Sequence, residues 1–134
     1  MVCDGASRGN PGPAGIGAAV LTPDGEVLAE IAEGLGEATN NVAEYTAALE
    51  GLRRAATLGA VEVDLRSDSR LLVEQLAGRY RVRATHLQPL HAAVLAEVRR
   101  FHRVTFRHVP REENTHADRL ANAGVDAWLA AQAG

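Results

Sequence analysis

The first third of the chain carries short apolar stretches broken by glycine and proline, which is the pattern of β-strands joined by turns. Residues 2–4 are predicted to form the end of a short strand, and residues 15–22 a second strand. Residues 26–31 alternate between polar and apolar side chains after a Pro-Asp-Gly turn signal, so they predict a third strand. Glycine and proline dominate residues 5–13, which are expected to form a loop. Together the three strands predict an antiparallel meander.

Further along the chain, helical and strand-like segments alternate. Helices are predicted at residues 41–58, 69–77, 87–101 and 115–130. Residues 61–65 and 104–109 alternate as strands. Strands that first form hairpins and then alternate with helices indicate an α/β fold, with helices packed on a mixed sheet. No repeat or linker divides the chain, so residues 1–134 are predicted to be one domain.

Composition narrows the class of protein. The chain has 134 residues, and its longest apolar run, residues 14–21, is far shorter than the roughly 20 residues that a membrane span needs. The lone Cys3 forbids an internal disulfide and a cysteine cluster for zinc, so a cytoplasmic protein without membrane contact is expected. All 14 basic residues are arginines, yet the net charge is −3. Binding to nucleic acid must therefore rest on local clusters of charge.

Four acidic residues stand at predicted strand ends or helix starts, and each has a structural explanation of its own. Asp4 fits an Asx turn before a glycine, and Glu44 lies three residues after Asn41, the spacing of a capping box. Asp68 and Asp118 are equally compatible with helix capping. If the four acids converge on one edge of the sheet, however, they repel one another unless divalent cations neutralise them. Their combination therefore predicts magnesium-dependent phosphoryl chemistry.

The motifs that contain these acids resemble, in order and spacing, those of type I ribonuclease H. They are residues 4–13 (DGASRGNPGP), 39–44 (TNNVAE), 67–69 (SDS), and 108–110 (HVP) leading to 114–118 (NTHAD). The resemblance implies a five-stranded mixed sheet, with three antiparallel strands followed by two parallel ones, flanked by helices. It also implies a monomeric endonuclease that hydrolyses the RNA strand of RNA–DNA hybrids and leaves 5′-phosphate and 3′-hydroxyl ends.

Position by position, the resemblance assigns roles to individual residues. The catalytic carboxylates, which hold two Mg²⁺ ions with Mn²⁺ as a substitute, are Asp4, Glu44, Asp68 and Asp118. His108 matches a mobile-loop histidine that aids proton transfer or product release. The residues implied to contact the hybrid are Gly5, Asn10, Thr39, Asn40, Asn41 and Arg70. Arg70 departs from the pattern, since many relatives have glutamine there.

Several alternatives stay open at this point. His108 can instead be a strand-end histidine that faces the sheet. The acids also fit another nuclease on the same sheet, such as a resolvase or a proofreading exonuclease, or a hybrid-binding module without catalysis. Asn40 and Asn41 favour ribonuclease H, because DNA-specific relatives have no 2′-hydroxyl to read. The basic helix that some bacterial members insert between residues 78 and 86 is absent, so substrate grip is expected from arginines in this segment. They are Arg79, Arg81 and Arg83.

Overall fold

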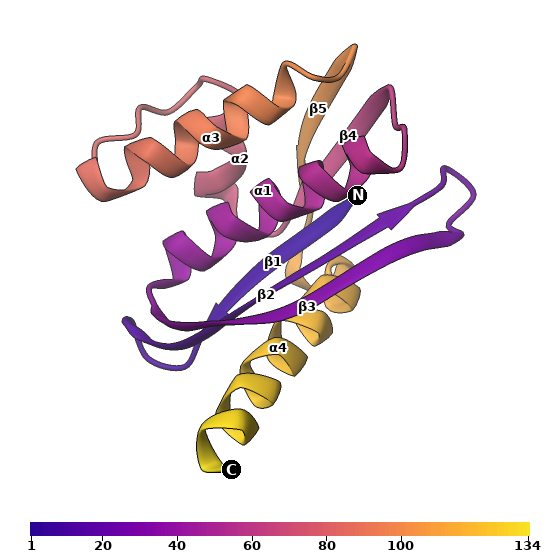
Figure 1. The fold of residues 1–134 in the computed structure, drawn as a ribbon. Helices are drawn as coiled ribbons and strands as arrows, with labels where there is room; N and C mark the ends of the chain where they lie inside the picture. The colour runs from indigo at the N-terminus through magenta and orange to yellow at the C-terminus, as the bar shows by residue number, and fades with distance from the viewer.

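A computed structural model describes all residues, 1–134, and shows one mixed sheet with helices on both faces (Figure 1). The strands are β1 (Val2–Ser7), β2 (Gly12–Leu21), β3 (Val27–Ala38), β4 (Glu62–Ser67) and β5 (Arg103–His108). The helices are α1 (Asn40–Thr57), α2 (Arg70–Leu76), α3 (Gln88–Val98) and α4 (Thr115–Ala133), with 3₁₀ turns η1 (Thr85–Leu87) and η2 (Arg111–Glu113). In the sheet order β3-β2-β1-β4-β5, the first three strands are antiparallel, and β4 and β5 run parallel to β1. The predicted α/β fold is confirmed.

The main core lies between the sheet and the helices α1, α2 and α3. Side chains that alternate along the central strands, such as Cys3, Ile16 and Leu65, point to this face and are buried there. Tyr45 and Leu52 of α1 pack against them. On the other face, α4 packs against β1, β2 and β3 (Figure 1). None of the helices combines the length and the hydrophobicity that spanning a membrane requires.

Strand β1 extends further than the sequence pattern predicts. The loop expected at residues 5–13 is wrong at both ends, because residues 5–7 pair with residues 14–16 of β2 and residues 12–13 already belong to β2. Only residues 8–11 connect the two strands. Pairing with a neighbouring strand here overrides the local preference of glycine for irregular structure. Asp4 therefore lies within a strand and not at its end, which removes the Asx-turn explanation for it.

Two glycines let helices approach the strands beside Asp4. A Cβ atom at Gly5 would lie 2.3 Å from the backbone nitrogen of Glu44, so only glycine allows α1 to rest on β1 at this point. A Cβ atom at Gly17, which pairs with Asp4, would lie 2.2 Å from the carbonyl oxygen of Ala117 on α4. Both faces of the sheet thus carry a closely packed helix where the acidic residues lie.

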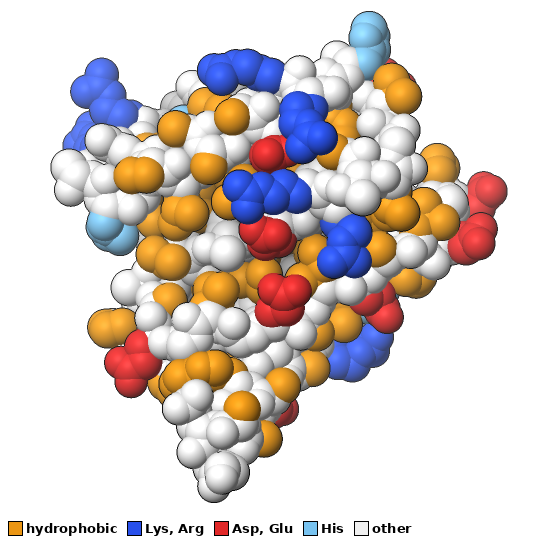
Figure 2. Space-filling view, viewed as in Figure 1, with side chains coloured by type: hydrophobic (Ala, Val, Ile, Leu, Met, Phe, Trp, Pro, Cys, Tyr) orange, Lys and Arg blue, Asp and Glu red, His pale blue; other side chains and the backbone are white.

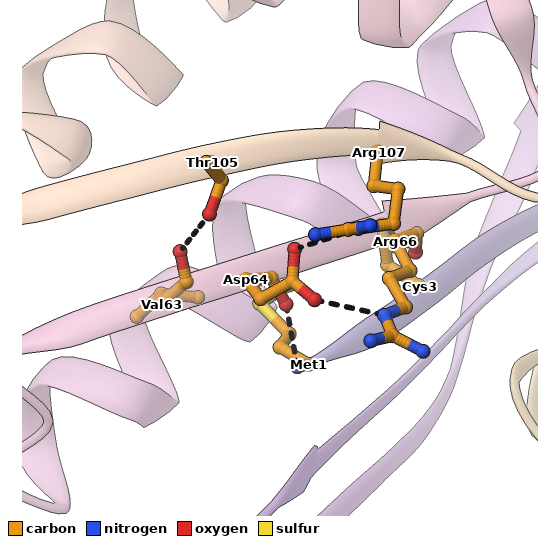
Figure 3. A network of polar contacts seen from close by, with 7 residues as sticks. All are labelled: Met1, Cys3, Val63, Asp64, Arg66, Thr105 and Arg107. Atoms are coloured by element: carbon orange, nitrogen blue, oxygen red, sulfur yellow. Dashed lines mark hydrogen bonds and ion pairs between the residues drawn. The ribbon is translucent and has the colours of Figure 1, made fainter. Parts of the chain in front are cut away.

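A polar network joins the start of β1 to β4 and β5 (Figure 3). The backbone nitrogen of Met1 donates to the carbonyl oxygen of Asp64 (2.8 Å). The Asp64 carboxylate accepts hydrogen bonds from Nε of Arg66 (2.9 Å) and Nε of Arg107 on β5 (3.4 Å). Partial burial alone would raise the pKa of Asp64, but these guanidinium groups hold it below its ordinary value. Because β1 and β4 pair only at Val2 and Arg66, the network adds cohesion where the ladder is short.

We expect Gly5→Ala to destabilise the protein. The added methyl group would meet the backbone of α1, which cannot turn aside as a flexible side chain can. The expected loss is about 1–3 kcal/mol, or roughly 3–10 °C in Tm. Thermal unfolding followed by circular dichroism measures it. Gly59→Asn is the control, because Gly59 has φ +86° and nothing lies within 4 Å of its Cβ position. An unchanged Tm for Gly5→Ala would contradict the close approach of α1.

Candidate active site

Four acidic side chains from four parts of the fold line one polar pocket of about 400 Å³. Asp4 comes from β1, Glu44 from the second turn of α1, Asp68 from the β4–α2 junction and Asp118 from the first turn of α4. The other lining residues are Gly5, Ala6, Ser7, Arg8, Asn40, Ser69, Arg111 and Asn122. A larger cavity of about 580 Å³ lies around Met1, but it contains no comparable cluster of acids. We therefore place the candidate active site in the smaller, acidic pocket.

The acidic residues lie together just beyond the point where the pairing between β1 and β4 ends. These parallel strands are paired only at Val2 and Arg66, and Asp4 and Asp68 each follow two residues later. β1 has its antiparallel neighbour β2 on one side and the parallel β4 on the other, so the chain order reverses at this strand. Open α/β sheets characteristically bind ligands at such a reversal, beyond the carboxyl ends of the strands. The topology therefore explains why the acids share one pocket.

Burial and repulsion between like charges raise the pKa values of two acids in this cluster. Asp4 is only 8% exposed. Burial, repulsion from Asp68 and a hydrogen bond with Asp118 raise the pKa of Asp4 to about 8. Burial also raises the pKa of Glu44 to about 7, although a hydrogen bond from Ser69 lowers it in part. Near neutral pH the cluster therefore holds protons unless a cation takes their place.

The donor set fits a divalent cation such as Mg²⁺, which prefers oxygen ligands. One oxygen, Oε2 of Glu44, is buried and has no hydrogen-bond partner. No group of three or more His, Cys, Asp or Glu side chains is arranged so that it could hold a metal ion by itself. Mg²⁺ is commonly bound by one or two carboxylates, with waters and substrate phosphates completing its octahedron. The pocket is therefore suited to an ion shared with a phosphate ligand and not to a closed protein cage.

The start of α1 holds several residues that the sequence predicts for the site. Thr39 caps this helix, with Oγ1 accepting from the N–H of Val42 (3.2 Å), so the predicted capping box at Asn41 is wrong. Oδ1 of Asn10 accepts from the N–H of Asn40 (3.1 Å), which ties the β1–β2 connection to the first residue of the helix. Asn40 lines the pocket, whereas Asn10, Thr39 and Asn41 lie outside its lining.

His108 and Arg70 also lie outside the pocket lining. His108 ends β5 opposite Ser67, and Arg70 is the first residue of α2. A hydrogen bond from Arg79 makes the largest contribution to lowering the pKa of Glu74 on α2, and the charges of Arg70 and His108 add to it. The structure therefore places both residues outside the pocket that the four acids line, with Arg70 at the start of α2 and His108 at the end of β5.

The pocket also contains polar residues that the sequence does not single out. They are Arg8, Ser69, Arg111 and Asn122. Nδ2 of Asn122 donates to the backbone oxygen (3.0 Å) and to Oδ1 (3.3 Å) of Asp118, and Arg8 lies 3.4 Å from Oδ1 of Asn122. Asn122 follows Asp118 by one helical turn. This spacing is the one feature of the sequence from which Asn122 could have been predicted as a site residue. Arg8 and Arg111 lie far apart in sequence, so no local pattern brings them together.

Comparison with known proteins relates the chain to one family. The profile of the family described as reverse transcriptase-like matches residues 2–124. The bifunctional protein Rv2228c of Mycobacterium tuberculosis is 50% identical over 125 residues, which cover 92% of this chain and 34% of that protein. The chain thus spans about a third of the length of its curated mycobacterial relatives. A ribonuclease H of Erythrobacter litoralis is 37% identical over 141 residues, which cover 92% of both chains.

Solved structures agree with this relationship. The N-terminal RNase H domain of rv2228c from M. tuberculosis, solved as a fusion with maltose binding protein, has a TM-score of 0.90 at 49% identity, covering 92% of this chain and 97% of that one. RNase H1 of the archaeon Halobacterium salinarum has a TM-score of 0.91 at 40% identity, covering 94% and 96%. LC11-RNase H1 in complex with an RNA/DNA hybrid has a TM-score of 0.91 at 39% identity, covering 96% of both chains.

We expect Asp4→Asn to stabilise the metal-free protein at high pH and not at low pH. The folded-state pKa of Asp4 is raised from 3.8 to about 8. The stability that its carboxyl contributes is therefore fully present below about pH 4 and is lost as the pH rises through 8. Asparagine mimics the neutral carboxyl at every pH. In EDTA the variant should match wild type at pH 4 and exceed its Tm by roughly 3 °C or more at pH 8.

Thermal unfolding with and without Mg²⁺ provides the measurement. Saturating Mg²⁺ at pH 8 should remove the advantage of Asp4→Asn, because the ion stabilises wild type and has lost a ligand in the variant. Asp24→Asn, an exposed change in the β2–β3 turn, serves as the control. A difference in Tm between Asp4→Asn and wild type that does not depend on pH would show that charge repulsion at Asp4 is not what limits stability.

Proposed function

This chain belongs to the ribonuclease H family, and we propose that it hydrolyses the RNA strand of RNA–DNA hybrids with divalent metal ions, leaving 5′-phosphate and 3′-hydroxyl ends. The convergence of four carboxylates on one polar pocket carries the proposal. The relative bound to an RNA/DNA hybrid supports the choice of substrate. All four acids come from a single chain, which supports a monomeric enzyme. The unpaired thiol of Cys3 fits a cytoplasmic location.

The carboxylates are proposed to bind two ions, either Mg²⁺ or Mn²⁺. The residues that would hold them are Asp4, Glu44, Asp68 and Asp118. Bound ions at such a site lower the pKa of an attacking water and neutralise charge on the scissile phosphate. The four acids come from separate elements, and packing of the helices against the sheet holds them in place before substrate arrives.

Other side chains are placed to orient the RNA strand. Oε2 of Glu44 is buried without a donor, so it can accept a hydrogen bond from a water or from a 2′-hydroxyl. Asn40 lines the same pocket, and its amide can both donate to and accept from a 2′-hydroxyl. His108 lies at the end of β5, and we assign it a supporting role in proton transfer or product release. Asn10, which binds the backbone of Asn40, would act by positioning this residue.

Arginines that form no ion pair are the candidates to contact the polyanionic substrate. Figure 2 shows arginine side chains over α3 and the loop before it, separated by other residues and not joined into one basic surface. In this loop Arg79 binds the Glu74 carboxylate through two hydrogen bonds (2.6 and 3.0 Å), so its charge is already neutralised. Arg81 and Arg83 are exposed and form no ion pair. These two residues are therefore the proposed phosphate contacts of the loop.

We expect Glu44→Gln to lower kcat by at least about 100-fold without lowering Tm. Glutamine keeps the size of the side chain, and Thr39 still caps α1, so the fold loses no contact there. A labelled RNA–DNA hybrid with Mg²⁺ measures the activity, with duplex RNA and duplex DNA as comparison substrates that should stay intact. Glu50→Gln on the same helix, where Glu50 pairs with Arg53 (2.8 Å), is the matched control and should keep wild-type turnover. Full activity of Glu44→Gln would show that the pocket is not the catalytic site.

Changing both Arg81 and Arg83 to alanine should raise KM and leave kcat unchanged. Phosphate contacts of this kind contribute equally to the ground state and the transition state. The slope of log affinity against log salt should also become shallower by about one to two units, since each phosphate contact contributes nearly one. Arg79→Ala is the control, because its partner Glu74 already neutralises its charge. Equal salt slopes for the double variant and wild type would show that this loop does not contact the nucleic-acid backbone.

A further inference from the structure

Asn114 stands at the start of α4, yet its side chain does not cap the helix. An asparagine at this position ordinarily accepts a hydrogen bond from an N–H two or three residues later, which stabilises the start of the helix. Here the side chain is instead turned into the protein and is only 1% exposed. The first turn is closed by the backbone, with the N–H of Asp118 donating to the carbonyl oxygen of Asn114 (3.1 Å). The amide is therefore free for contacts other than capping.

These contacts join three elements that carry acidic residues. Nδ2 of Asn114 donates to the carbonyl oxygen of Cys3 (3.0 Å) and to Oδ1 of Asp68 (3.3 Å). Cys3 directly precedes Asp4 on β1, and Asp118 follows Asn114 by one helical turn. A single amide thus links β1, the β4–α2 junction and the start of α4. No other side chain makes hydrogen bonds to both β1 and the β4–α2 junction.

The Asn114 amide connects β1 to the β4–α2 junction at a point where the two strands are not paired. β1 and β4 have no paired residues beyond Val2 and Arg66, so no backbone ladder fixes the separation of Asp4 and Asp68. Repulsion between these carboxylates favours a wider separation. Oδ1 of Asn114 is buried and has no partner, and an unsatisfied buried acceptor is unfavourable. Packing alone does not explain the amide, because an apolar residue could not donate to the Cys3 carbonyl oxygen or to the Asp68 carboxylate.

We propose that Asn114 is a positioning residue for metal binding. It holds the Asp68 carboxylate and the backbone beside Asp4 at the separation that divalent ions require. Asn114 does not line the pocket, so it acts through these groups and not by touching the nucleic acid. The inference rests on the proposed function for the role of the ions. Outer partners of metal ligands commonly change metal affinity by about 10–100-fold when they are removed.

The test measures Mn²⁺ affinity of the full chain by calorimetry, without any nucleic acid. Asn114→Ala should weaken Mn²⁺ binding by about 10–100-fold. Asn114→Ser can still donate one hydrogen bond and should lie between this variant and wild type. In assays with labelled hybrid, Asn114→Ala should lower kcat at a fixed, low Mg²⁺ concentration, recover activity at higher Mg²⁺, and keep the KM for the hybrid. A residue that only supports the fold would lower Tm without shifting the Mg²⁺ dependence.

Val94→Ala is the control for a general loss of stability. Val94 is fully buried in α3 and does not line the pocket, so this variant should lose stability and keep wild-type Mn²⁺ affinity. A folded Asn114→Ala variant whose Mn²⁺ affinity changes less than twofold overturns the proposal, and Asn114→Ser decides the question if the alanine variant does not fold. Failure of the wild-type chain to cleave hybrids would instead overturn the proposed function, because the Mn²⁺ measurement contains no hybrid.

Discussion

Repulsion among clustered, partly buried carboxylates is the constraint on which the rest of this structure depends. Burial of Asp4, repulsion from Asp68 and a hydrogen bond with Asp118 together raise the pKa of Asp4 to about 8. A cluster of this kind opposes folding when no cation is bound. The core between the sheet and α1, α2 and α3 must therefore supply the stability that the site removes. The short pairing between β1 and β4 likewise gives up stability to keep the pocket, because further pairing of these strands would close it.

Backbone contacts, more than side-chain contacts, bring the acids together. Gly5 and Gly17 let α1 and α4 touch the strands on opposite faces, and each helix carries its acid to Asp4 from a different side. A metal site needs its ligands at fixed separations, and rigid elements provide this better than loops do. The helix starts also place partial positive charge near the acids, which eases their repulsion in part. The arrangement of helices and strands thus serves both to position the acidic residues and to bury the core.

Hydrophobic spacing was enough to locate the helices and the strands β4 and β5 to within a few residues, because each buries one face on the core. It failed at residues 5–7, where glycine indicated a loop and only pairing with a distant strand shows otherwise. The capping-box spacing to Glu44 also indicated Asn41 as the cap, whereas Thr39 caps the helix. A hydrogen bond from the N–H of Asn40 to Asn10, which is distant in sequence, helps to fix this helix start. The four acids could be named from their motifs, but the inward turn of Asn114 has no local signal.

In the proposed reaction, charge balance would couple the metal ions to the substrate. The chain has a net charge of −3, and four acids line the pocket that a polyanion would have to approach. The nearby Arg8 is already paired with Asp126 (2.8 Å), so it offers the substrate only part of its charge. Cations bound in the pocket would reverse the local sign and would offer coordination positions to phosphate oxygens. Linkage would make this effect mutual, since a bound phosphate would complete the coordination that the carboxylates leave open. Metal affinity measured without substrate would therefore be the property of an incomplete site, to which only the protein contributes ligands.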